Sequence, residues 1–207
     1  MPCVTQETTS ASTTAMSDLI KPEIFSTKNA PTWAPWLLGK VLVRMHADGN
    51  AAHHVITETE AYNGEHDLAC HASKGRTART DVMYRAGGVW YVYLCYGVHE
   101  MLNLVVGPEG FPAAVLIRGL QGINGPGRLT KRLGIARALN GQPADVTSGL
   151  YLEDSGVVVP RKWIQTAPRI GVNYAGPIWS KKPWRYFIDP AWPGLAALQS
   201  SQPPPPR

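Results

Sequence analysis

Alternation of hydrophobic and polar residues is clearest between residues 55 and 103. Two runs there, VITETEAY (55–62) and VWYVYLCY (89–96), have the composition and the period of two that are typical of β-strands. Because successive side chains of a strand point to opposite faces, the first run places three polar side chains on one face: Glu58, Glu60 and Tyr62. The pattern therefore predicts a strand on which a carboxylate lies beside an aromatic ring.

The second run carries two tyrosines on a common face, Tyr91 and Tyr93. It ends at Tyr96-Gly97, a pair that permits a turn, and a further apolar stretch, MLNLVV (101–106), follows. This order predicts a β-hairpin with a tyrosine at its tip.

Similar reasoning predicts the other elements of the chain. A short helix within 30–38 leads into a first strand near 41–45, and a turn at Asp48-Gly49-Asn50 joins that strand to the one that carries Glu60. The remaining predicted elements are a short helical segment (67–72), strands at 113–120, 150–154, 157–163 and within 181–189, and a glycine-opened amphipathic helix through Leu129, Leu133 and Ala136. Short strands with turn signals and few helices predict an α+β fold: a single domain with a curved, mainly antiparallel β-sheet, flanked by short helices and with a protruding β-hairpin.

The two ends of the chain differ in composition from this domain. Residues 1–20 are polar and of low complexity, which predicts a disordered N-terminal arm, and residues 193–207 form a proline-rich tail that we expect to be flexible. The folded domain is then expected over residues 21–192. The N-terminal stretch lacks the apolar core of a secretory signal or a membrane span, so we expect no membrane association.

Composition and charge narrow the function classes only slightly. A chain of 207 residues with 44% hydrophobic content can bury one sizeable core. The net charge is +5, and basic residues cluster at Lys74, Arg76, Arg79 and Arg85 and again at Lys181, Lys182 and Arg185. Such clusters suit a polyanion, but an ordinary solvated surface explains them equally well.

Three cysteines, Cys3, Cys70 and Cys95, form no C-x-x-C pair. Their odd number and irregular spacing argue against a disulfide framework and against a zinc site. We therefore expect an intracellular protein, cytoplasmic or associated with the nucleoid, without a metal.

An ordered series of motifs carries a resemblance to a known family. The series is ETEAYNG, DLACH, GRTART, YVYLCYG, AAVLIR, GPGRLTKRLGI, PRIGVNYAG and KKPWRYFI. From Leu37 to Ile188 the chain resembles the alkyladenine DNA glycosylases, which are also called 3-methyladenine DNA glycosylases. The resemblance implies a monofunctional base-excision repair enzyme without a cofactor. Such an enzyme acts as a monomer on double-stranded DNA that contains 3-methyladenine, 7-methylguanine, hypoxanthine or ethenoadenine.

The resemblance also implies the catalytic roles. Glu60 is similar to the general base that activates the hydrolytic water, and Arg118 and the backbone at Val172 help to hold that water. A carboxylate suits this reaction, because it can deprotonate the attacking water and stabilise an oxocarbenium-like sugar. Without the resemblance, Glu60 would be interpreted as a surface strand residue and Arg118, inside an apolar run, as a structural ion pair.

Tyr62, His71 and Tyr93 are similar to the residues that sandwich the extruded base, and Asn103 to a residue that clashes with the 2-amino group of normal guanine. Aromatic rings suit this task, since N-alkylated purines are electron-poor and often cationic. From the residues alone, core packing explains the tyrosines and a structural hydrogen bond explains the histidine.

Tyr96 is similar to the wedge residue that fills the gap left by the extruded nucleotide. We expect Arg76 and Arg79, in the basic loop, to contact the DNA backbone. Two positions depart from the usual family pattern. Glu100 would weaken DNA binding if it pointed toward phosphate, and Gly87-Gly88, in place of Pro-Gly, would soften the hairpin.

Two other function classes stay open. One is a nucleic-acid-binding module that has the same scaffold but no activity. The other is an RNA-directed module, because the fold resembles the C-terminal domain of methionyl-tRNA formyltransferases. The complete set of matched residues favours the enzyme, and the absence of a lysine among them favours hydrolysis by water over an imine mechanism.

Overall fold

The computed structural model describes residues 18–196. Its strands are β1 (Asp18–Leu19), β2 (Val41–Met45), β3 (Ala51–Asn63), β4 (Trp90–Cys95), β5 (His99–Val105), β6 (Ala113–Leu120), β7 (Ile123–Asn124), β8 (Leu150–Asp154), β9 (Ile164–Ala167) and β10 (Arg185–Ile188). Its α-helices are α1 (Ala30–Trp36), α2 (Pro126–Arg132) and α3 (Gly176–Trp179). Short 3-10 helices are η1 (Pro22–Ser26), η2 (His71–Lys74), η3 (Asp81–Tyr84), η4 (Arg137–Leu139), η5 (Val146–Ser148), η6 (Arg161–Trp163) and η7 (Asn173–Ala175).

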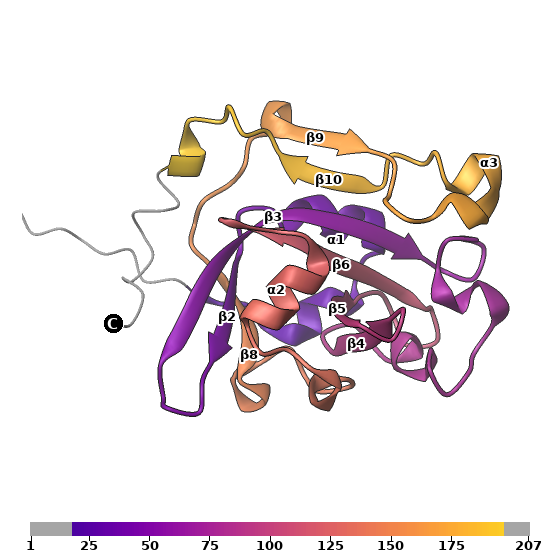
Figure 1. The fold of residues 1–207 in the computed structure, drawn as a ribbon, viewed down its shortest axis with the longest axis horizontal. Coiled ribbons are helices and arrows are strands. Elements are labelled where there is room, and N and C mark those ends of the chain that lie inside the picture. Colours follow the sequence, from indigo (N-terminus) through magenta and orange to yellow (C-terminus); the bar gives the residue numbers. More distant parts are fainter. Residues whose placement is uncertain (1–17, 197–207) are drawn as a thin grey trace, which may run out of the picture.

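The sheet is built around the long strand β3, as Figure 1 shows. The strand order is β1-β8-β2-β3-β6-β5-β4, β10 pairs with both β3 and β9, and every pairing is antiparallel. The register between β3 and β6 shifts on both sides of Glu58, which is the mark of a β-bulge. β3 can therefore pair with β2 through its first half and with β6 and β10 through its second half. The expected α+β fold with a mainly antiparallel sheet is confirmed.

One hydrophobic core lies on the inner face of this sheet. Helix α1 packs against β3, and the Thr59 hydroxyl donates a hydrogen bond of 2.8 Å to the carbonyl of Ala34 in that helix. Thr59 and Ala61 are fully buried on this side. The alternation predicted for residues 55–62 then directs Glu60 and Tyr62 to the opposite face of β3.

The loop from 64 to 89 covers that opposite face. Its 3-10 helices η2 and η3 contribute Ala72 and Met83 to a second hydrophobic cluster, which also contains Tyr91 from β4 and Ala114 from β6. The predicted helical segment at 67–72 is thus realised only as the 3-10 turn η2 at its end.

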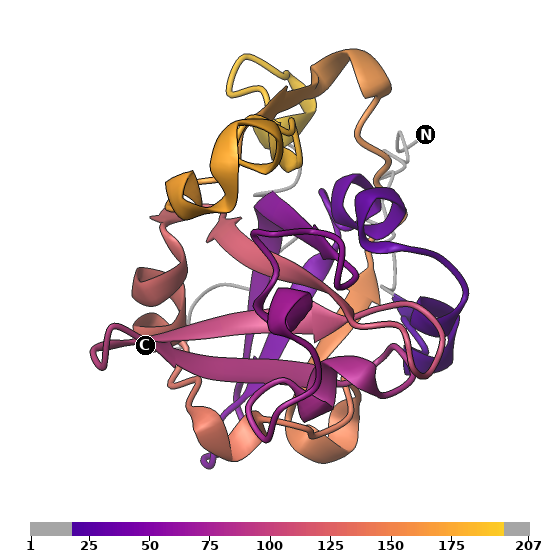
Figure 2. The same ribbon diagram turned by 90° about the vertical axis from the view of Figure 1, so that its right-hand side faces the viewer.

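Strands β4 and β5 form the predicted hairpin, with Trp90 opposite Leu104 and Cys95 opposite His99. In Figure 2 this magenta hairpin projects from the body of the domain. Tyr96 lies at its turn with 92% of its surface exposed. Its φ of 50° is the only positive φ of a non-glycine residue in the described part of the chain. Because the left-handed region costs an ordinary residue about 1 kcal/mol, the turn holds an apolar ring in solvent at some conformational cost.

Two predicted elements have different bounds. The strand expected over 157–163 is absent, because Pro160 cannot donate to a ladder and η6 follows it. Pairing resumes at β9. Helix α2 ends at Arg132, before Ala136, since Gly134 adopts a left-handed φ of 61° just after it.

The expected disordered arm over 1–20 is wrong at its last three residues. Asp18 and Leu19 pair with β8, and the Ile20 amide donates to the Leu152 carbonyl at 2.9 Å. Residues 1–17, like residues 197–207 of the expected tail, lie outside the described residues. At the start of that tail, Leu195 still packs against the core.

The Gly87-Gly88 turn is tightly packed, contrary to the expectation that it softens the hairpin. A side chain on Gly87 would collide with the Phe25 carbonyl, and one on Gly88 with the Pro22 carbonyl. The Gly88 amide donates to the Val105 carbonyl at 2.9 Å. The two glycines therefore allow η1 to pack closely against the end of the hairpin.

Candidate active site

A cavity of about 1150 Å³ lies between the outer face of the sheet and the loops that cover it. Its lining brings together nearly all the predicted site residues: Glu60, Tyr62, His71, Arg79, Tyr93, Tyr96, Asn103, Arg118 and Val172. Arg76 is the exception. Among the described residues, no group of three or more His, Cys, Asp or Glu is arranged to hold a metal ion, and no helix is long and apolar enough to cross a membrane.

Glu60 is a fully buried carboxylate at the wall of this cavity. One oxygen, Oε1, accepts a hydrogen bond of 2.9 Å from the Ile170 amide, and Oε2 accepts one of 2.8 Å from the Tyr62 hydroxyl. Burial raises the pKa of Glu60, and the nearby Arg118 and the two donors oppose that rise. Each oxygen keeps a further lone pair, so the carboxylate can still accept a bond from water.

Arg118 joins Glu60 to a second carboxylate. Its Nε lies 3.1 Å from Oε1 of Glu58 and 3.6 Å from Oε1 of Glu60. Arg185 also reaches Glu58 Oε1, at 2.8 Å. The expected pairing of this half-buried arginine is confirmed, and Arg118 is held where it can keep Glu60 ionised.

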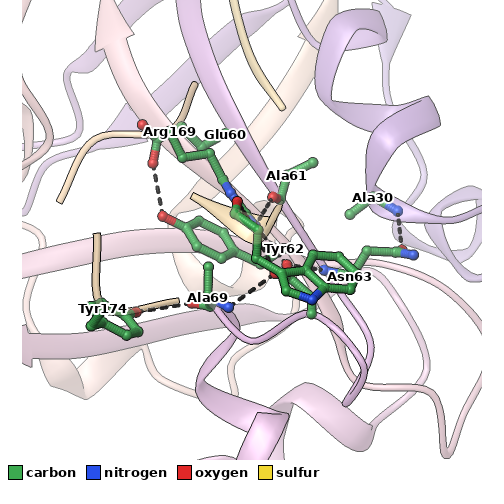
Figure 3. A network of polar contacts seen from close by, with 10 residues as sticks. Ala30, Glu60, Ala61, Tyr62, Asn63, Ala69, Arg169 and Tyr174 are labelled. Atoms are coloured by element: carbon green, nitrogen blue, oxygen red, sulfur yellow. Dashed lines mark hydrogen bonds and ion pairs between the residues drawn. The ribbon is translucent and has the colours of Figure 1, made fainter. Parts of the chain in front are cut away.

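A buried ion pair beneath Glu60 and Tyr62 was not foreseen from the sequence. Arg169 donates to both oxygens of Asp67, at 2.6 and 2.8 Å, and both side chains are fully buried. The Arg169 guanidinium also donates to the Ala61 carbonyl at 2.8 Å and lies 4.8 Å from the centre of the Tyr62 ring. Figure 3 shows how this network surrounds Tyr62 and Glu60.

The ion pair fixes the loop that supplies the Ile170 amide. Arg169 precedes Ile170 in the chain, and Asp67 accepts further bonds from the Asn63 and Ala69 amides, at 3.2 and 3.1 Å. The end of β3, the loop after it and the PRIGV segment (168–172) are thereby joined. The only sequence signals were an arginine inside a glycine-containing apolar loop and an aspartate before the apolar run LAC.

Three aromatic rings form the opposite wall of the cavity. The rings of His71 and Tyr93 meet edge to face with centroids 4.5 Å apart, and His71 Nδ1 lies 3.0 Å from the Tyr91 hydroxyl. Burial, together with the charge of Arg79, lowers the pKa of His71 to about 4. The imidazole is therefore neutral at pH 7.

Asn103 and Val172 also face the cavity. The Asn103 side-chain amide donates to the Tyr91 carbonyl at 3.1 Å, which fixes its orientation. Val172 is buried, but the backbone group that bonds Glu60 belongs to Ile170. The sequence did not point to Ile170, and the expected role of the Val172 backbone in holding the hydrolytic water stays a prediction.

The outer rim carries the remaining predicted residues. Arg76 lies outside the cavity, and its exposed guanidinium pairs with Asp81 at 2.8 Å. Arg79 faces the cavity, with its Cζ 5.1 Å from the Tyr93 ring centre. Glu100 pairs with Arg137: Oε1 of Glu100 lies 3.5 Å from Nε of Arg137.

Comparison with known proteins agrees with this geometry. The family model of methylpurine-DNA glycosylase (MPG) matches residues 24–124 and 121–191. Proteins named "Putative 3-methyladenine DNA glycosylase" are similar along most of the chain. The one from Myxococcus xanthus is 44% identical over an alignment of 176 residues, and the match covers 81% of this chain and 89% of the relative.

A second relative, from Methanocella arvoryzae, is 45% identical over an alignment of 171 residues, and the match covers 73% of this chain and 83% of the relative. The relative from Rickettsia felis is 40% identical over 177 residues, covering 82% of this chain and 93% of its own. Matches of this extent, together with a family model that spans most of the described residues, leave one assignment: the chain belongs to the methylpurine-DNA glycosylase family.

Proposed function

We propose that this protein excises alkylated or deaminated purines from double-stranded DNA by hydrolysing the N-glycosidic bond, and so leaves an abasic site. The observation that carries the proposal is Glu60, a fully buried carboxylate that lines a cavity walled by tyrosine rings. The family membership and the names of the relatives support the same reaction.

In the reaction that we propose, Glu60 accepts a proton from a water molecule as the water oxygen bonds to the anomeric carbon. The bond from that carbon to the purine nitrogen breaks, and its electron pair leaves with the base. The sugar acquires oxocarbenium character in between, which the negative charge of Glu60 stabilises. Arg118 and the Ile170 amide keep Glu60 ionised and oriented.

The damaged base must leave the helical stack to reach this carboxylate, because neither the base nor the sugar carbon is accessible within a duplex. We propose that Tyr62 and Tyr93 stack on the extruded base and that Asn103, which also lines the cavity, contacts its edge. All these groups come from one chain, so we propose that the protein acts as a monomer.

Base release from defined duplexes tests this function. Duplexes that carry hypoxanthine, ethenoadenine or a methylated purine are incubated with the protein and then treated with alkali to cleave abasic sites. We expect strand breaks only after alkali. Binding to damaged duplex without base release would support a non-catalytic module, and a preference for RNA would support an RNA-directed one.

Replacing Tyr96 with alanine should impair base extrusion while the fold remains intact. The side chain is exposed at a turn, so its loss removes no core contact, but nothing then fills the gap in the duplex. We expect a loss of about 1 to 3 kcal/mol in transition-state stabilisation, measured as kcat/KM on a hypoxanthine duplex. An equal loss on a single-stranded hypoxanthine oligonucleotide would contradict the wedge role, because that substrate needs no extrusion from a stack.

Replacing Arg76 with glutamine should reduce the salt dependence of DNA binding. We propose that this exposed guanidinium contacts phosphate, and losing one such contact reduces the slope of log K against log salt by about one. Asp81→Asn is the reciprocal variant, since it frees Arg76 from its ion pair and should strengthen binding. Titrations at several salt concentrations measure both, and an unchanged slope in Arg76→Gln would exclude the contact.

A further inference from the structure

The mouth of the cavity carries positive charge that no carboxylate of residues 18–196 pairs with. Four charged side chains line the cavity: Glu60, Lys74, Arg79 and Arg118. Deep in the site, Glu60 and Glu58 are balanced by Arg118 and Arg185. Lys74 and Arg79 have no carboxylate within 4 Å among the described residues.

Arg79 is the group that brings this charge to the aromatic wall. Its guanidinium lies over the Tyr93 ring, with Cζ 5.1 Å from the ring centre, and an Nη atom is 3.1 Å from His71 Nε2. Burial raises the pKa of Tyr91, and Arg79 beside the hydroxyl opposes that rise. The side chain is exposed in the free protein, but these contacts direct it toward the cavity instead of the surrounding solvent.

The contact with Arg79 also fixes the tautomer of His71. A guanidinium can only donate, so Nε2 accepts and the imidazole proton lies on Nδ1, which donates to the Tyr91 hydroxyl at 3.0 Å. The side of the wall nearest Arg79 therefore presents hydrogen-bond donors and a cation, and no anion.

This arrangement acts against a cationic base. If a flipped purine stacks on the face of Tyr93 that Arg79 covers, it must displace the guanidinium. If it stacks on the other face, Arg79 already interacts with the electron-rich π system of the ring, and the charge of Arg79 repels a second cation. A neutral purine avoids this repulsion, and the acceptors on its edge, such as O6 and N7 of hypoxanthine, can be met by the guanidinium donors.

We propose that Arg79 is a specificity-determining residue, which biases the site toward neutral deaminated or etheno-purines and against cationic N-methylpurines. This inference rests on the proposed glycosylase function. It replaces the expectation that Arg79 serves the DNA backbone, and it qualifies the idea that the tyrosines favour cationic bases.

The test compares two bases within one DNA sequence, so that the phosphate contacts are the same. Single-turnover release of 3-methyladenine from a duplex treated with dimethyl sulfate is compared with release of hypoxanthine from the same duplex synthesised with inosine. Arg79→Gln removes the charge and keeps a donor. It should raise the ratio of 3-methyladenine to hypoxanthine release about tenfold. Arg79→Lys keeps a cation that can also lie over an aromatic ring, and it should preserve the wild-type ratio to within about threefold.

Arg76→Gln is the matched control from the same loop. Its guanidinium lies outside the cavity, so it should reduce release of both bases by the same factor. An equal loss of both activities in Arg79→Gln would show a phosphate contact only and would overturn the proposal, as would an unchanged ratio. Failure of the wild-type protein to release either base would refute the glycosylase function itself, and this inference with it.

Discussion

Glu60→Gln should reduce single-turnover release of hypoxanthine to near background while DNA binding survives. Glutamine keeps the shape of the side chain. Its amide oxygen can accept from the Ile170 amide, and its NH₂ can donate to the Tyr62 hydroxyl. What it cannot do is take a proton from water or stabilise a cationic sugar. Loss of the general base alone costs roughly a hundred- to ten-thousand-fold, and loss of the charge adds to that.

Three further measurements isolate the chemistry from the fold. Because burial disfavours the charged form of Glu60, the variant should unfold at no lower denaturant concentration than the wild type. The wild-type rate should fall as the pH is lowered through the raised pKa of Glu60, because only the ionised carboxylate accepts a proton. Glu58→Gln removes one carboxylate from Arg118 but leaves Glu60 in place, so its loss should be at least about tenfold smaller. Near-normal turnover in Glu60→Gln, or equal losses in the two variants, would show that the base has been misassigned.

The parts of the site that sequence patterns could predict are those that depend on local geometry. A period of two correctly placed Glu60 and Tyr62 on one face of β3, and the structure joins them by a hydrogen bond of 2.8 Å. An apolar strand that ends in Tyr-Gly correctly predicted a hairpin tip with an exposed Tyr96. In both cases the relevant residues are neighbours in the chain, so the backbone period alone determines their relation.

Long-range contacts left no such signal. Asp67 and Arg169 are 102 positions apart, and nothing near either residue indicates its partner. The same limit explains the glycine pair at 87 and 88, whose close packing depends on the distant carbonyls of Pro22 and Phe25. Propensity also failed at 157–163, where a valine run predicted a strand but Pro160 prevented pairing. The residue roles came from the family resemblance, which carries long-range information that the patterns lack.

The buried ion pair between Asp67 and Arg169 serves the geometry of the site more than the stability of the fold. Asp67 and Arg169 are fully desolvated, and such a pair is seldom more stabilising than apolar residues of the same size. Here the pair fixes the backbone of three segments around Glu60 and Tyr62. Its value to the protein then lies in the geometry that it imposes on Glu60, the carboxylate that we propose as the general base.

Asp67→Ala should therefore be strongly destabilising, by about 3 to 5 kcal/mol, because it leaves the Arg169 guanidinium buried without a counter-ion. Urea denaturation monitored by tryptophan fluorescence measures this change in the free energy of unfolding, since the centre of the Trp184 ring lies 5.1 Å from Cζ of Arg169. The matched control is Asp81→Ala, which removes the partner of Arg76 in an exposed ion pair. That variant should cost no more than about 1 kcal/mol.

The double variant Asp67→Leu with Arg169→Met separates an unpaired charge from lost packing. Removing both charges at once leaves no buried ion, so the double variant should be more stable than Asp67→Ala, although it has lost the same ion pair. Its glycosylase activity should nevertheless stay low, because nothing then holds Ile170 at Glu60 or a guanidinium against the Tyr62 ring. For Asp67→Ala, a fall in the free energy of unfolding of less than about 1 kcal/mol would show that the Arg169 charge is not confined as the structure has it. For the double variant, recovery of stability together with full activity would show that the ion pair has no part in positioning Glu60.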